Sequence, residues 1–66
     1  MNITIYVSVL SDKKQAMLAQ LIQKELESLG YEEQAEIDEI ISNGLDSKLC
    51  DLEELIPLNV LTSIAS

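Results

Sequence analysis

Hydrophobic residues alternate with polar ones at the start of the chain. In "NITIYVSV" the residues at every second position are Ile3, Ile5, Val7 and Val9. This period of two places them on one face of an extended segment, and β-branched and aromatic residues are typical of strands. The pattern therefore predicts a strand over residues 2–9.

The period then becomes helical. The segment "DKKQAMLAQLIQKELESL" carries apolar residues three or four positions apart, namely Met17, Leu18, Leu21, Ile22, Leu26 and Leu29. Such spacing is typical of an amphipathic helix. Ser11 suits the N-cap and Gly30 the C′ position. We expect a long helix over residues 12–29, packed across a sheet.

The middle of the chain supports two interpretations. Helical spacing is seen at Ile37, Ile40, Ile41, Gly44 and Leu45. It favours a helix that stops at "NG" (residues 43–44), with Glu32, Glu33 and Glu36 in its first turns, where the helix dipole favours carboxylates. Alternation at Tyr31, Glu33, Ala35 and Ile37 would instead fit a short strand. We favour the helix.

The last third predicts a short helix and a strand. Leu49, Leu52, Leu55 and Ile56 suit a helix capped by Asp46 or Ser47 and ended by Pro57. In the tail, one face of a strand would hold Leu58, Val60, Thr62 and Ile64, although Val60, Leu61, Ile64 and Ala65 also fit a helix. The expected fold is one α+β domain, residues 1–66: a two-layer structure with an N-terminal strand, a long amphipathic helix, one or two short acidic helices and a C-terminal strand.

Composition limits how this domain can be stabilised. The chain has 66 residues, 47% of them apolar, with Cys50 as its single cysteine and no histidine. An internal disulfide is therefore excluded, and no metal or cofactor site is expected. Because so short a chain has a marginal core, we expect help from self-association or from a partner.

Charge is distributed unevenly. Residues 1–24 hold three lysines and one aspartate, a net of +2, whereas residues 25–66 hold eleven carboxylates and Lys48, a net of −10. The total of −8 would repel nucleic acids and anionic membranes, so direct binding to either is not expected. The sequence has neither a secretory signal pattern nor a long apolar run, and a cytoplasmic location is expected.

The acidic block is the leading candidate site. The carboxylates proposed to bind a partner are Glu32, Glu33, Glu36, Asp38, Glu39, Asp51, Glu53 and Glu54. Carboxylates on successive helix turns lie about 5.4 Å apart, close to the spacing of duplex phosphates, which suits nucleic-acid mimicry. The hypothesis is a non-enzymatic inhibitor or modulator that docks on a basic, nucleic-acid-handling protein. Size and charge also resemble those of small proteins from phages and mobile elements. The simpler interpretation is a solvated face that keeps the protein soluble.

Two other hypotheses use different residues. A homo-oligomeric assembly protein would associate through a free strand edge and an apolar surface of Leu58, Val60, Leu61 and Ile64. A small-anion binder or enzyme would use Ser8, Ser11, Lys13 and Lys14 around the first helix N-terminus. No glycine precedes Gly30, so a phosphate-binding glycine loop is absent and lysines that balance the acidic half are the simpler explanation. No catalytic residue is predicted.

Overall fold

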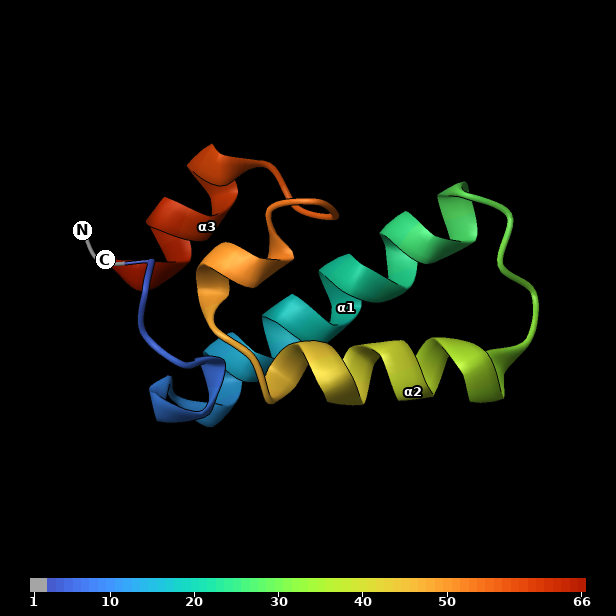
Figure 1. Ribbon diagram of the computed structural model, residues 1–66, viewed down its shortest axis with the longest axis horizontal. Coiled ribbons are helices and arrows are strands. Elements are labelled where there is room, and N and C mark those ends of the chain that lie inside the picture. The colour runs from blue at the N-terminus through green and yellow to red at the C-terminus, as the bar shows by residue number, and fades with distance from the viewer. Residues whose placement is uncertain (1–2) are drawn as a thin grey trace.

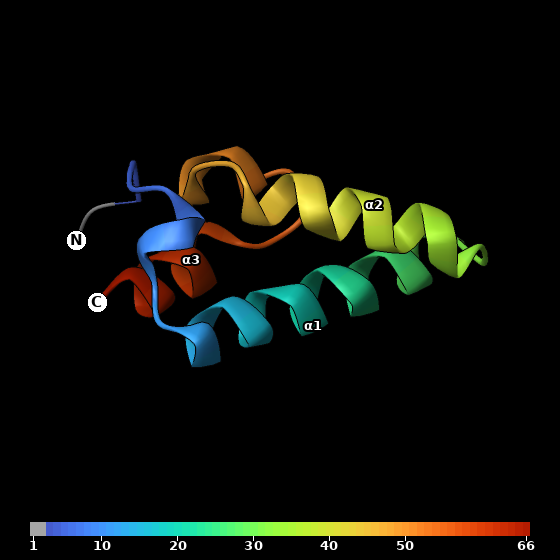
Figure 2. The same cartoon turned by 90° about the horizontal axis from the view of Figure 1, so that it is seen from below.

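The regular secondary structure of the described part of the chain is helical, and no strand is formed there. The structure is a computed structural model that describes residues 3–66. Its elements are η1 (Val7–Val9), α1 (Asp12–Ser28), α2 (Gln34–Leu45), η2 (Leu49–Leu52) and α3 (Leu58–Ala65). The helices α1 and α2 form an antiparallel hairpin, and η1, η2 and α3 gather at the end away from its turn (Figures 1 and 2). The domain is all-α.

The predicted long helix is confirmed as α1. Ser11 is its N-cap, and the Ser11 Oγ accepts a hydrogen bond of 3.3 Å from the backbone N–H of Lys14. The residues of α1 that enter the core are Leu18, Ile22 and Leu26, which recur at helical spacing. The cap and the apolar period therefore determine this element locally.

The helical interpretation of the middle segment is confirmed, and the strand over residues 31–37 is not formed. However, α2 continues through Asn43 and Gly44 to Leu45. Gly44 is buried inside the helix, where a Cβ atom would lie 3.1 Å from Leu52 Cδ2 and 3.2 Å from Ile22 Cδ1. Its role is to allow close packing and not to end the helix.

The prediction of an N-terminal strand is wrong, and with it the α+β class. Residues 3–7 form hydrogen bonds with residues 47–50: Val7 N–H donates to Ser47 O (2.9 Å), and Leu49 N–H donates to Ile5 O (3.0 Å). These bonds form one isolated antiparallel bridge, Tyr6 with Lys48. The chain then turns into η1, which buries Val7 and leaves Val9 70% exposed. Asn2, the first residue of the predicted strand, lies outside the described residues.

The predicted C-terminal strand is also wrong, because residues 58–65 form α3. This helix buries Leu61 and Ile64, three residues apart, and follows Pro57 at its N-cap position. Without a second strand, the alternating N-terminal segment has no sheet to join, and its backbone groups bond to the turn before η2 instead.

The short helix expected before Pro57 is present only as the 3₁₀ turn η2. Its N-cap is Lys48, and neither Asp46 nor Ser47 caps it. The Asp51 carboxylate instead accepts a hydrogen bond of 3.1 Å from the Lys48 N–H. Ser47 Oγ donates to Gly44 O at 2.7 Å, which ties the end of α2 to the same turn.

One apolar core joins all of these elements. Its fully packed members are Val7, Leu18, Ile22, Leu26, Ile37, Leu49, Leu52, Ile56, Leu61 and Ile64. Among the described residues, none of the buried ones is polar or charged. The free energy of folding therefore comes mainly from apolar burial, and the charges stay on the surface.

Paired substitutions distinguish the observed N-terminal turn from the strand. Val7→Ala should lower the free energy of unfolding by about 2 kcal/mol, because it leaves a cavity in the core. Val9→Ala should change it by less than about 0.5 kcal/mol, as at other exposed sites. Urea denaturation followed by circular dichroism would measure both. Equal losses at the two positions would contradict the observed structure, since a strand would place both valines on the same face.

Candidate functional site

The turn between α1 and α2 forms a hollow at one end of the molecule. The residues that line it are Leu29, Gly30, Tyr31, Glu32, Glu33 and Glu36. The turn lies at the opposite end of the hairpin from α3 (Figure 1). The hollow combines an aromatic ring, an exposed leucine and three carboxylates. The larger surface of residues 25–39 that surrounds it is called the hairpin end below.

Gly30 sets the path of the chain into this hollow. Its φ angle is +100°, which residues with a Cβ atom rarely adopt. In that conformation Gly30 N–H donates to Glu27 O (3.0 Å) and Tyr31 N–H donates to Leu26 O (3.0 Å). These two bonds form a Schellman motif, which satisfies carbonyl groups at the end of α1. Gly30 is therefore the C′ residue that the sequence predicts.

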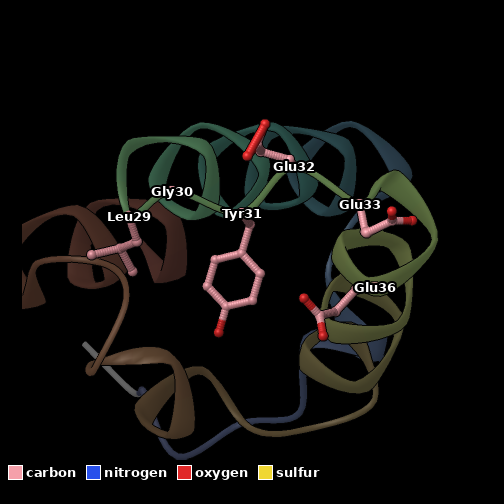
Figure 3. Close-up of a pocket in the computed structure, with 6 residues that line it drawn as sticks. All are labelled: Leu29, Gly30, Tyr31, Glu32, Glu33 and Glu36. Carbon is pink, nitrogen blue, oxygen red and sulfur yellow. The ribbon is translucent and has the colours of Figure 1, made fainter.

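The Tyr31 ring is the centre of the hollow. Figure 3 shows the ring between the end of α1 and the start of α2, with the Glu36 side chain directed toward it and Glu32 and Glu33 directed outward. Tyr31 is 36% exposed, so part of the ring remains accessible. An aromatic ring beside a carboxylate suits a cationic side chain, which can contact the ring and bond to the carboxylate.

Two glutamine side chains hold α1 and α2 together next to the hollow. Gln23 Nε2 donates to Gln34 Oε1 (3.1 Å), and Gln34 Nε2 donates to Gln23 Oε1 (2.9 Å). Each amide also donates to a carboxylate four residues further along its own helix: Gln23 to Glu27 and Gln34 to Asp38, both at 2.8 Å. This network fixes the hairpin end and orients two of its carboxylates.

The eight predicted carboxylates are all exposed, but they do not form one surface. Glu32, Glu33 and Glu36 line the hollow, and Glu39 follows Glu36 by three residues on a neighbouring part of α2. Asp38 lies beside Gln34. The remaining three, Asp51, Glu53 and Glu54, belong to η2 and the turn after it, beyond the other end of α2. Because Glu33 is the N-cap residue and Glu32 precedes it, only Glu36 lies in the first turn of α2.

The hairpin end is uniformly acidic. Residues 25–39 contain seven carboxylates and no lysine. Across residues 3–66, no lysine pairs with any of these seven. Sequence reasoning predicted the acidic set but missed Tyr31 as a member of the site. The C′ position of Gly30 could have indicated it, since the residue after such a glycine turns back toward the helix.

The apolar set predicted for self-association is only partly at the surface. Leu61 and Ile64 are buried in the core, Val60 is partly buried, and Leu58 is 46% exposed. The free strand edge does not exist within residues 3–66, because this part of the chain contains no strand. The surface as predicted is therefore reduced to part of α3.

The set predicted for anion binding is engaged in internal contacts. Ser11 Oγ caps α1 through Lys14 N–H. Lys14 Nζ donates to the main-chain oxygen of Ser66 at 2.9 Å. Ser8 contributes its carbonyl oxygen, which accepts from Gln15 Nε2 at 3.3 Å. Lys13 is exposed. Two of the four residues therefore use side-chain or main-chain groups within the molecule around the start of α1, and Lys14 contacts a main-chain oxygen.

Two kinds of site are not found in the described part of the chain. No group of three or more His, Cys, Asp or Glu side chains within residues 3–66 is placed to hold a metal ion. In the same range, the helices are too short or too polar to span a membrane.

Comparisons with protein-family models, with curated proteins and with solved structures found no match for this chain. Its function is therefore inferred from the geometry and charge of its own residues.

Replacing Gly30 tests how the hairpin end is built. Gly30→Ala should lower the free energy of unfolding by about 1–2 kcal/mol, because its positive φ disfavours a Cβ atom. No atom lies within 4 Å of the added Cβ position, so the cost is conformational and not steric. Ser28→Ala, at the exposed last residue of α1, is the control and should change stability by less than about 0.5 kcal/mol. A neutral Gly30→Ala would show that the turn does not need this conformation.

Proposed function

We propose that this chain is a small, non-enzymatic protein-binding module of the cytoplasm. Its hairpin end docks on a basic surface of a partner protein that handles nucleic acid, and the bound chain inhibits or modulates that partner. Docking requires no cofactor. The carboxylates proposed to contact the basic surface are those of Glu32, Glu33, Glu36 and Glu39, with Asp38 at the edge of the contact.

The uncompensated charge of the hairpin end carries this proposal. Seven carboxylates within residues 25–39 have no lysine among them, and the five from Glu32 to Glu39 are remote from every lysine in the sequence, so their mutual repulsion is relieved mainly by solvent and counterions. A basic partner would provide the missing positive charges, and the opposite fields would speed association. Solubility alone would be served by mixed surface charges and does not require seven carboxylates together.

The rigidity of the hairpin end supports specific docking. The Schellman turn at Gly30 and the glutamine pair Gln23–Gln34 hold the ends of two helices in a defined arrangement. A backbone held in this way loses little conformational entropy on binding, so the cost of ordering is limited to the glutamate side chains. The hairpin end is therefore a better docking surface than a disordered acidic tail of equal charge.

The hollow indicates which side chain the partner would insert. An arginine could place its guanidinium plane against the exposed part of the Tyr31 ring and bond to Glu36. Leu29, which is 60% exposed, would cover the aliphatic part of that side chain. Arginines of this kind are common on surfaces that bind nucleic-acid phosphates. This is the reason for proposing a nucleic-acid-handling partner.

Two adjacent glutamate pairs allow a matched test. The variant Glu32→Lys/Glu33→Lys alters the hairpin end, and Glu53→Lys/Glu54→Lys makes the same change in net charge at the turn after η2. We expect basic proteins from a cytoplasmic extract to be retained by the immobilised wild-type chain. For a retained protein, calorimetry should show affinity at least tenfold weaker for the first variant and within about twofold for the second. Raising salt from about 50 to about 500 mM should weaken wild-type binding.

Equal losses for both variants would contradict the proposal, since net charge alone would then explain retention. Unchanged binding by the hairpin-end variant would contradict it as well. Competition with a DNA duplex tests the choice of partner. Displacement of the chain by the duplex would support docking at a nucleic-acid site, and binding of both together would show that the partner surface is elsewhere.

A further inference from the structure

Most of the charged side chains at the two ends of α1 have the sign that its helix dipole disfavours. Lys13 and Lys14 lie in the first turn together with Asp12, whereas Glu25 and Glu27 lie in the last turn, which holds no basic residue; Lys24 directly precedes it. A helix dipole destabilises cations near the N-terminus and anions near the C-terminus. Within one molecule this is offset only in part: Lys14 bonds to Ser66 O, and Glu27 accepts from Gln23.

Between these two charged ends, the outer face of α1 holds two apolar residues, Met17 and Leu21, beside Gln20 and Lys24. A shallow hollow there is lined by Met17, Gln20, Leu21 and Lys24, whose spacing of three, four and seven residues places them on one side of the helix. Met17 is 46% exposed and Leu21 is partly buried. The core residues of α1 occupy a different face. In Figure 2, α1 lies along one edge of the molecule, with α2 on one side of it.

This face is complementary to itself when two copies run antiparallel. Its centre lies between Gln20 and Leu21, and Lys13 and Glu27 are about 11 and 10 Å from that centre along the axis, at 1.5 Å per residue. A two-fold axis at the centre therefore places Lys13 of each copy opposite Glu27 of the other. On the other flank, Lys14 faces Glu25 in the same way. A two-fold interface contains each pair twice.

We propose that the outer face of α1 binds a second copy of this chain in an antiparallel, two-fold dimer. The dimer buries Met17 and Leu21 and pairs the oppositely charged ends of the two α1 helices, which also compensates both helix dipoles. The burial adds apolar area to a chain whose own core is small. This dimer does not rest on the proposed docking function, because the residues of the hollow at the hairpin end are not part of it.

Charge exchange tests the register of the dimer. By sedimentation equilibrium, the wild-type chain should have twice the monomer mass of 7.3 kDa. Lys13→Glu should raise the dimer dissociation constant about tenfold, through two lost ion pairs and the repulsion that replaces them. Glu27→Lys should weaken the dimer similarly, although it makes the net charge of each copy less negative and so reduces the overall repulsion. The double variant Lys13→Glu/Glu27→Lys should return the constant to within about twofold of wild type. A double variant as weak as the single ones would overturn the proposal.

Cross-linking provides a second measurement that does not depend on charge. In a Cys50→Ser background, Gln20→Cys places a thiol beside the proposed axis, and oxidation should yield a disulfide-linked dimer. Glu27→Cys is the matched control, because its thiol would lie about 20 Å from its copy along the axis. Circular dichroism confirms that each variant remains folded. A monomeric wild-type chain, cross-linking at both positions, or cross-linking at neither would overturn the antiparallel dimer, and none of these outcomes would affect the docking proposal.

Discussion

The close approach at Gly44 is the contact on which the arrangement of the short segments depends. Because this residue has no side chain, Ile22 of α1 and Leu52 of η2 both reach the last turn of α2. Leu52 belongs to the turn that also supplies Leu49 to the core, and the turn's backbone bonds to residues 3–7. A larger residue at this position would hold η2 away from the hairpin and would weaken both attachments.

An entirely apolar core leaves all of the charge at the surface, and the hairpin decides where that charge lies. The carboxylates of residues 25–39 surround the turn between α1 and α2, whereas Lys13 and Lys14 lie at the start of α1, near the end of α3. The hairpin end is therefore acidic without cations, whereas at the opposite end most of the few lysines lie among further carboxylates such as Asp12 and Asp51. This uneven distribution makes directed electrostatic association more effective than a uniform charge would.

The two proposed surfaces are compatible with each other. An antiparallel dimer through the outer face of α1 would direct its two hairpin ends away from each other. Each hairpin end would keep Tyr31 and its neighbouring glutamates available. A dimer with two such ends could engage two sites on one basic partner, and the second contact would benefit from a high effective concentration.

Sequence alone determined the elements whose signals are local. Ser11 and Gly30 mark the ends of α1, and the helical period at Ile37, Ile40 and Ile41 marks α2, because caps and amphipathic periods act within a few turns of chain. The acidic block was equally visible. Tertiary structure decided that Val7 is buried and Val9 exposed, and that residues 58–65 form a helix. A short alternating segment becomes a strand only where another strand supplies hydrogen-bond partners. It also decided that the carboxylates of η2 and the turn after it lie apart from those near Tyr31, since distances between α2 and η2 depend on packing and not on spacing along the chain.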